Sequence, residues 1–291
     1  MMMHTMAAKY SFHRVTPYLC RSFVTAAPTL QDVPPSIEHF QPGLCVIRNA
    51  LTIHQQIRLT KTSCTLGTRA APLGFFDDHG QPNSRAYRGR IFSAVSHWPH
   101  WIQEQICHRT VRLAREQDKT LPPMSCTHIL LLCYMNAEGV GWHRDIYEND
   151  GQKDHPVITV NLGNSCEFIF KDDHTAPKTH VTLNSGDCLI FGGPQRHAMH
   201  KVAQVFEHTC PSYLADDIAV VLQRAKETSD DGALIGTSGR LSLTFRDAPS
   251  VIGREEEFST FKVDEHFDKE ENFNWNAQDN GLIDAQPGQE K

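Results

Sequence analysis

The feature that most constrains this chain is a series of short, β-prone segments in its second half. They are rich in Ile, Val, Thr, Phe and Leu, and they cover 127–135, 157–163, 166–171, 180–184, 187–191 and 240–246. Turn residues separate them, for example Ala137-Glu138-Gly139 and Asn184-Ser185-Gly186. Many short strands joined by tight turns are typical of an antiparallel barrel or jelly roll. We therefore expect a mainly-β core.

Helical patterns precede and interrupt this region. Residues 43–65 predict a short strand followed by a helix, and residues 99–117 predict a second helix. The stretch 66–100 is rich in Gly, Pro, Asp and Arg, which indicates loop and hairpin. Residues 203–239 are expected to form an insertion with a helix over 215–226. The sequence thus predicts an α+β, mainly-β fold with N-terminal helices.

Composition excludes several classes of protein. The chain has 291 residues, 40% of them hydrophobic, which is enough for one large domain or two small ones. Its longest apolar runs, such as Ile129–Cys133, are far shorter than the roughly 20 residues of a membrane-spanning helix. The nine cysteines are scattered without a Cys-x-x-Cys, which argues against a disulfide framework or a zinc ribbon. We expect an intracellular protein in a reducing compartment.

The two ends of the chain differ from its body. Residues 1–35 contain no acidic side chain before Asp32, so they fit either an unstructured leader or a mitochondrial transit peptide. Cytoplasm, nucleus and mitochondrion therefore all stay open. Residues 254–291 carry 11 acidic and 4 basic side chains, a net charge of −7, whereas residues 1–253 carry +1. We expect one folded domain over 36–249 and an acidic tail over 250–291.

Aromatic side chains accompany the acids of this tail, namely Phe258, Phe261, Phe267, Phe273 and Trp275. One interpretation is a solvated, disordered end. The other is a docking or self-shielding segment, in which acids and aromatic rings imitate a nucleic-acid strand. The sequence alone leaves both interpretations open.

His143-Arg144-Asp145 is the first candidate for a metal site. A His-x-Asp triplet is a weak signal by itself, and the chain contains a second one at His266-Phe267-Asp268. The first triplet lies between two expected strands, so a rigid scaffold can hold its side chains. The second lies in the charged tail without such a scaffold, and we reject it. The sequence therefore offers His143 and Asp145 as metal ligands.

A third ligand is expected downstream. His200 follows the expected strand 187–191 and the turn Gly192-Gly193-Pro194, and we favour it over the competing His197. Two histidines and one carboxylate form a facial triad with open positions, which suits non-haem Fe(II). Zinc would accept the same three ligands.

The last β-prone segment alternates strictly between polar and apolar side chains. Arg240, Ser242, Thr244 and Arg246 share one face of the strand 240–246, and Leu241, Leu243 and Phe245 share the other. Guanidinium groups bind carboxylates bidentately, so a cavity with two arginines suits a dianion such as 2-oxoglutarate. The alternative is a half-exposed edge strand with solvated arginines.

Together these motifs resemble the AlkB-like family of Fe(II)/2-oxoglutarate-dependent dioxygenases. The resemblance covers about 125–248, with a weaker likeness from Gly43 onward. The matching pieces are Tyr134, His143-Arg144-Asp145, Ser185-Gly186-Asp187, Phe191-Gly192-Gly193, Arg196, His200 and Arg240 to Arg246. This resemblance implies a double-stranded β-helix, also called a jelly roll, with a substrate-recognition lid over about 66–100.

The resemblance also implies the roles of individual residues. His143, Asp145 and His200 would hold Fe(II), with 2-oxoglutarate and O2 as cosubstrates. Arg240, assisted by the hydroxyl of Tyr134, would bind the distal carboxylate of 2-oxoglutarate, and Arg246 would lie near its metal-bound end. Arg196 would be structural. Ser242 would also contact the cosubstrate, although the family usually has Asn at this position and another Asn where Leu132 stands.

The activity that the resemblance implies is oxidative demethylation of N-methylated bases in DNA or RNA, which releases formaldehyde, succinate and CO2. The candidate substrate-binding residues are Arg69, Phe76, Tyr87, Arg88 and Tyr147. Tyr147 replaces an acidic residue of bacterial members, which leaves the preferred base open. A same-fold enzyme for a protein or small molecule and a catalytically silent nucleic-acid-binding module are the alternatives. No membrane partner is expected, and a monomer is favoured.

Overall fold

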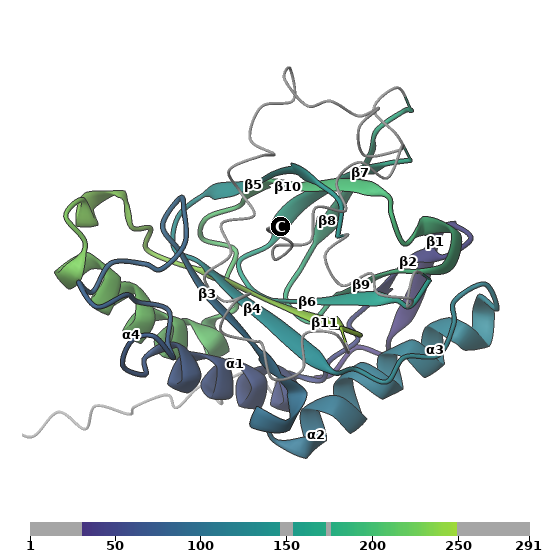
Figure 1. Cartoon of the computed structure of the whole chain (residues 1–291), viewed down its shortest axis with the longest axis horizontal. Coiled ribbons are helices and arrows are strands. Elements are labelled where there is room, and N and C mark those ends of the chain that lie inside the picture. Colours follow the sequence, from purple (N-terminus) through teal and green to yellow (C-terminus); the bar gives the residue numbers. More distant parts are fainter. Residues whose placement is uncertain (1–30, 146–153, 173–175, 249–291) are drawn as a thin grey trace, which may run out of the picture. The chain divides into compact units, whose positions relative to one another are not determined.

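The computed structural model describes residues 31–145, 154–172 and 176–248 (Figure 1). Four sequence-based expectations therefore lie outside the described residues, namely most of the leader 1–35, Tyr147, the rejected His266-Phe267-Asp268 and the acidic tail. In the part of the chain that is described, no helix is long and apolar enough to cross a membrane.

Two antiparallel sheets form the core of the fold (Figure 1). The larger sheet has the order β1-β2-β9-β6-β11-β4-β3. Its strands are β1 Ser36–Gln41, β2 Leu44–Arg48, β3 Arg88–Ala94, β4 His128–Tyr134, β6 Val157–Gly163, β9 Cys188–Phe191 and β11 Arg240–Arg246. The smaller sheet has the order β5-β10-β7-β8, formed by β5 Glu138–His143, β7 Cys166–Lys171, β8 Thr179–Leu183 and β10 Met199–Val205. The prediction of a mainly-β double-stranded β-helix is confirmed.

Helices cover the outer face of the larger sheet (Figure 1). They are α1 Ile53–Gly67, α2 His100–Ile102, a π-helical turn over Gln103–His108, α3 Arg109–Gln117 and α4 Ser212–Thr228. Thr52 and Gln55 form a reciprocal capping box that begins α1. Apolar side chains of these helices pack against the outward side chains of the central strands, such as Leu131 and Leu243, in one continuous core. The inner face of the sheet is thereby left to line the space between the two sheets.

The segment 66–100 differs from a simple loop and hairpin. Its last third is β3, which pairs with β4 along its whole length as an edge strand of the larger sheet. Phe75 and Phe76 have no exposed surface and belong to the main core. Their burial anchors the backbone of this Gly- and Pro-rich stretch to the core. This segment is therefore partly a structural edge of the fold.

The expected strands match β6, β7 and β11 in their bounds, and four strands fall outside the expected strand segments. These are β1, β3, β5 and β10. Ala137-Glu138-Gly139 was expected as a turn, but Glu138 and Gly139 are the first two residues of β5. β10 extends into the expected insertion 203–239. A Cβ atom on Gly139 would overlap the carbonyl oxygen of Val202, so the glycine here serves a close approach of β5 to β10.

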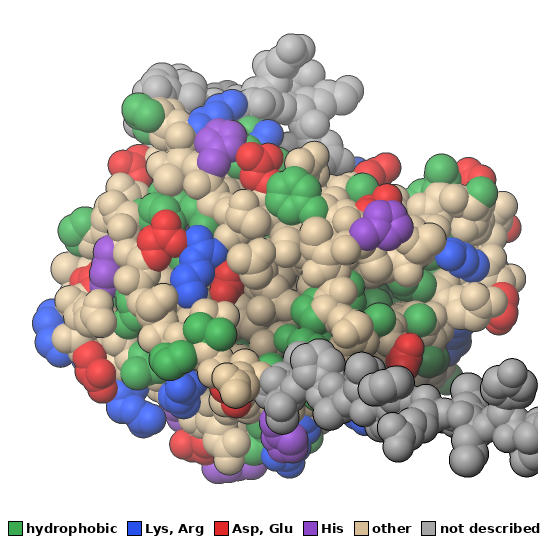
Figure 2. All heavy atoms as spheres, turned by 180° about the vertical axis from the view of Figure 1, so that it is seen from behind, with side chains coloured by type: hydrophobic (Ala, Val, Ile, Leu, Met, Phe, Trp, Pro, Cys, Tyr) green, Lys and Arg blue, Asp and Glu red, His purple; other side chains and the backbone are tan. Residues whose placement is uncertain are grey.

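Charge is mixed on the surface. On the described part of the face drawn in Figure 2, Lys and Arg side chains alternate with Asp and Glu side chains without a broad field of one sign. This agrees with the near-neutral charge of residues 1–253. All eight described cysteines are free thiols, and seven of them are buried.

Candidate metal centre and carboxylate site

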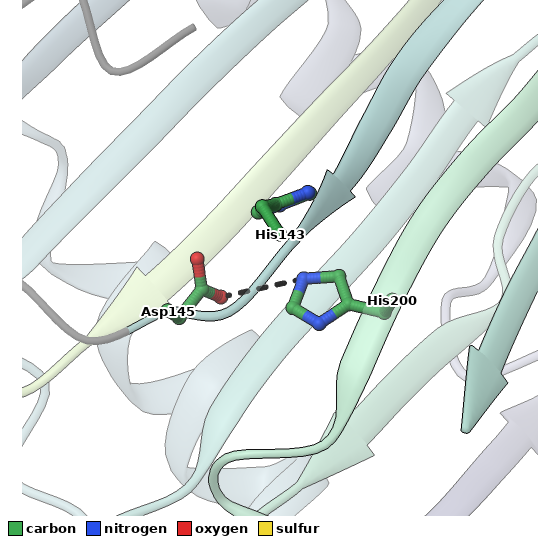
Figure 3. A group of neighbouring side chains, drawn as sticks. All are labelled: His143, Asp145 and His200. Carbon is green, nitrogen blue, oxygen red and sulfur yellow. Dashed lines mark ion pairs between the residues drawn. The ribbon is translucent and has the colours of Figure 1, made fainter. Parts of the chain in front are cut away.

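Strand register brings the three expected metal ligands together (Figure 3). His143 is the last residue of β5, and it lies directly opposite His200 on β10 in the antiparallel pairing. Asp145 follows the end of β5 by two residues, and its carboxylate points toward the ring of His200 (Figure 3). The candidate ligand atoms of the three side chains all lie within 4.8 Å of one another. Two distant parts of the sequence thus form one cluster with the spacing that a metal ion requires.

The two histidines present the same nitrogen atom to this cluster. His143 Nδ1 lies 2.9 Å from the carbonyl oxygen of Gly141, and His200 Nδ1 lies 3.0 Å from that of Ala198. A carbonyl oxygen can only accept a hydrogen bond, so each Nδ1 carries the proton. The lone pair of each Nε2 is therefore available to a metal ion.

Electrostatics favour the ligand forms of these side chains. Burial and the neighbouring His143 lower the pKa of His200 to about 4, so its imidazole is neutral near pH 7. Burial alone would raise the pKa of Asp145, but the neighbouring groups, with Arg246 first among them, together outweigh it and lower that pKa. Arg246 Nη2 lies 2.9 Å from Asp145 Oδ1. The cluster thus combines a neutral His200 imidazole with an ionised Asp145 carboxylate.

Two arginines hold Asp145 in place. Arg246 binds its carboxylate, and Arg196, which is buried, donates to its backbone carbonyl. Arg196 was expected to be structural. Its observed contact is with the backbone of a candidate metal ligand, so it also orients the site.

Arg240 lies on the same inner face of the larger sheet, six positions before Arg246 on β11. Its register partners are Tyr134 on β4 and Gly163 on β6. The guanidinium carbon lies 4.5 Å from the centre of the Tyr134 ring, and Nε donates to Asn161 Oδ1 at 2.5 Å. The side chain is 1% exposed, and its Nη1 is buried with no hydrogen-bond partner among the described residues.

A buried guanidinium N–H without an acceptor is costly, because its water has been removed and not replaced. A ligand carboxylate would supply the missing acceptor. The donor set therefore fits both groups expected from the sequence: two imidazoles and a carboxylate for Fe(II), and a buried cationic N–H for an organic anion.

The alternation of β11 is observed as expected, but the strand is a central one and not an edge strand. Leu241, Leu243 and Phe245 belong to the main core, and Ser242 pairs with Leu132 and Asn161 on the inner face. All seven residues of β11 are buried, and the strand lies between β6 and β4. The alternative of a half-exposed edge strand with solvated arginines is therefore wrong.

Sequence reasoning missed Asn161. This residue is fully buried on β6, and its amide oxygen accepts the Nε hydrogen bond of Arg240. A signal for it was available in the sequence. Asn161 is the one amide in the segment Val157–Leu162, whose other residues are all apolar except Thr159. A buried polar side chain in such a strand needs partners, which marks it as part of a site.

The four expected substrate-binding residues that the structure describes differ widely in burial. Arg69 is exposed, Tyr87 is half-buried and Arg88 is buried. Arg88 Nη1 donates to the carbonyl oxygen of Gly139 at 2.6 Å, which ties β3 to the start of β5. Phe76 has no exposed surface, and the guanidinium carbon of Arg224 lies 4.6 Å from the centre of its ring. Phe76 thus offers no surface to a base in this conformation.

Comparisons with known proteins agree with this geometry. The family model described as "2OG-Fe(II) oxygenase superfamily" matches residues 44–246. The DNA N(6)-methyladenine demethylase ALKBH1C of Arabidopsis thaliana is 30% identical over 128 residues, which are 43% of this chain and 25% of that protein. The DNA N(6)-methyladenine demethylase ALKBH1D of the same plant is 23% identical over 236 residues, which are 71% of this chain and 49% of that protein.

The chain therefore spans between a quarter and about half of the length of these relatives. Among solved structures, one described as "The structure of OsALKBH1" has a TM-score of 0.56 and 22% identity. The likeness covers 72% of this chain and 99% of that one. At this identity, the likeness supports the fold.

Proposed function

This chain belongs to the 2OG-Fe(II) oxygenase superfamily, and from that premise we propose that it removes methyl groups from N-methylated bases of DNA or RNA. The observation that carries the catalytic part is the pair of sites on facing sheets. The His143, Asp145 and His200 cluster lies on the side of the smaller sheet, and the unpartnered Nη1 of Arg240 lies on the inner face of the larger one.

The metal centre is the first part of the proposal. His143 Nε2, His200 Nε2 and a carboxylate oxygen of Asp145 would hold Fe(II), and the facial arrangement of such ligands leaves positions open. When bound, Fe(II) with 2-oxoglutarate and O2 would supply the oxidation that hydroxylates an N-methyl group. The hydroxylated methyl group would leave the base as formaldehyde, and 2-oxoglutarate would be converted to succinate and CO2. Arg246 and Arg196 keep Asp145 ionised and oriented for this role.

The cosubstrate site is the second part. Arg240 would bind the distal carboxylate of 2-oxoglutarate through its unpartnered Nη1, while Asn161 holds its Nε from the other side. Tyr134 and Ser242 would complete this end of the site, and Arg246 would lie near the metal-bound end. A carboxylate bound to a buried guanidinium is strongly favoured, because the arginine has already lost its water.

Methylated nucleic acid is the substrate class that we propose. The printed names of both plant relatives describe DNA N(6)-methyladenine demethylases. A base in a duplex must leave the stack before its methyl group can reach a buried metal centre. Arg69 and Tyr87 are the candidates for contacts with the flipped nucleotide, together with Tyr147, which lies outside the described residues. A role in the repair of methylated DNA would follow from this activity.

Mass spectrometry of methylated oligonucleotides tests the proposal. DNA and RNA strands with N1-methyladenine or N6-methyladenine, single- and double-stranded, are incubated with the protein, Fe(II) and 2-oxoglutarate, and succinate is measured in parallel. Asp145→Ala removes a metal ligand, and Asp216→Ala removes an exposed carboxylate on α4 as the matched control. We expect demethylation by the wild type and by Asp216→Ala, and none by Asp145→Ala.

The two readouts separate the parts of the proposal. Succinate without demethylation would retain the iron chemistry and would reject these bases as substrates, leaving a protein or small molecule. No succinate above the level of Asp145→Ala would contradict the enzymatic proposal as a whole. A silent nucleic-acid-binding module would then be the better description.

A further inference from the structure

A surface groove runs along α3, on the side of the larger sheet that faces away from the metal ligands. Its volume is about 400 Å³. Val111, Pro123 and Met124 form its apolar floor. Its rim has the imidazole of His108 and four charged residues, namely Arg112, Arg115, Glu116 and Lys119. Three permanent cations against one carboxylate make this rim positive.

The cations of the rim differ in how much of their hydrogen-bonding capacity is used. Arg115 Nε donates to the carbonyl oxygen of Leu121, and Lys119 Nζ donates to that of Arg115. His108 contacts Glu104 and the carbonyl oxygen of Ser125. Arg112 is exposed, and within the described residues it has no ion pair or hydrogen bond from its side chain. Arg112 can therefore bind a further carboxylate at this rim.

The described chain ends beside this groove. Asp247 Oδ2 accepts from the backbone N–H of Ser125 at 3.0 Å, and Ala248 N–H donates to Thr127 Oγ1 at 2.7 Å. Ser125 is adjacent to Met124, which lines the floor, and its carbonyl oxygen contacts His108 on the rim. Any residue shortly after Ala248 is therefore tethered next to the groove.

The sequence that follows Ala248 contains the acidic and aromatic side chains that would complement a cationic and apolar groove. Glu255-Glu256-Glu257 is followed by Phe258 and Phe261, and residues 254–291 carry a net charge of −7. The seven residues from Ala248 to Glu255 can span up to roughly 25 Å. A nine-residue helix such as α3 is only about 14 Å long. The glutamates can therefore reach any part of the groove.

We propose that residues 255–261 of this chain dock in the α3 groove, with the three glutamates at its cationic rim and Phe258 and Phe261 on its apolar floor. A short tether keeps the segment at an effective concentration of order mM, so weak contacts are sufficient for docking. Docking holds an acidic, aromatic segment on the face opposite the metal ligands. The proposal does not depend on the proposed enzymatic activity.

Carbodiimide cross-linking of the full-length protein, followed by mass spectrometry, tests this docking. The reagent joins a lysine amine to a carboxylate in contact with it. We expect cross-links from residues 255–257 to Lys119, and few to Lys61 on α1 or Lys226 on α4, although both of these lysines are exposed. An even distribution over the three lysines would overturn the proposal.

A charge swap provides the matched controls. Arg112→Glu with Lys119→Glu should abolish the cross-links, as should replacement of the glutamates 255–257 by lysine. The combination of both sets should restore them with the two partners exchanged. Lys61→Glu with Lys226→Glu makes the same change in net charge and should leave the wild-type cross-links intact. If the combined variant fails to restore them, charge pairing at this groove is refuted.

Two further readouts complete the test. A mixture of unlabelled and 15N-labelled chains reports whether the cross-link joins one chain to itself. Cross-links between light and heavy chains would assign the groove to a second copy and overturn docking within one chain. Metal titration of the α3 variant checks that it is folded, and we expect an unchanged affinity because α3 contacts only the outer face of the sheet.

Discussion

Replacement of Arg240 by methionine separates binding of the cosubstrate from folding. The variant keeps an unbranched side chain at a position that is 1% exposed but removes the cation from the inner face. Removing one partner of a buried charge pair costs about 3–5 kcal/mol. The affinity for 2-oxoglutarate should therefore fall by roughly a hundredfold to several thousandfold.

The stability of the ligand-free protein should change much less. Arg240→Met loses the hydrogen bond to Asn161, which is worth about 1.5–3 kcal/mol because the donor is charged. It also removes the buried, unpartnered Nη1, whose desolvation costs about 1–3 kcal/mol. These contributions oppose each other, so we expect the free energy of unfolding to change by about 1 kcal/mol or less. Without ligand, the arginine thus contributes little net stability.

Thermal unfolding with and without 2-oxoglutarate measures both effects, with Mn²⁺ in place of Fe²⁺ so that no turnover occurs. At a ligand concentration a hundred times its Kd, the wild type should gain about 2.7 kcal/mol of stability. Arg240→Met should gain none and should unfold near the ligand-free wild type. If the variant retains the full 2-oxoglutarate-dependent shift, Arg240 does not bind the carboxylate.

Three further predictions concern other parts of the fold. Gly139→Ala should force β5 away from Val202 on β10 and lower the free energy of unfolding by about 1–3 kcal/mol. It should also weaken Co²⁺ binding in a titration, because His143 lies on β5. Unchanged Co²⁺ affinity would refute the role of this close approach. Phe75→Ala should lower the free energy of unfolding in urea by about 3–5 kcal/mol, because the ring has no exposed surface; a loss below 1 kcal/mol would contradict this. Hydrogen bonds from Thr120 and Gly43 lower the pKa of Asp118 against the effect of its burial, so this carboxylate stabilises the fold above its unfolded pKa and stops doing so as pH falls through its folded pKa. Asp118→Asn should therefore be destabilised at pH 7 but approach the wild type in acid, and a pH-independent difference would refute this assignment.

The strands that could be predicted are those whose own residues are β-prone. β6, β7 and β11 were expected with their observed bounds, because branched and aromatic residues dominate them. β5, with the sequence Glu138-Gly139-Val140-Gly141-Trp142-His143, contains two glycines and gives no such signal. It is a strand because β10 pairs with it, and that pairing is a long-range contact.

The residues of the candidate site were predictable to different degrees. The identities of the three metal ligands followed from the His-x-Asp motif, its context and the family resemblance. Phe76 illustrates the opposite case, because an aromatic ring in a Gly- and Pro-rich segment is equally compatible with a lid and with a core. Only packing against Arg224 and the main core distinguishes the two.

The sequence by itself determined which chemical groups are present: two histidines and a carboxylate for a metal ion, and a strand with arginines on one face. The tertiary structure decided which of them meet. The register of β5 against β10 places His143 opposite His200, and the central position of β11 turns Arg240 and Arg246 inward. These decisions depend on pairing between segments far apart in the chain, and the pattern within one segment does not specify which distant segment pairs with it.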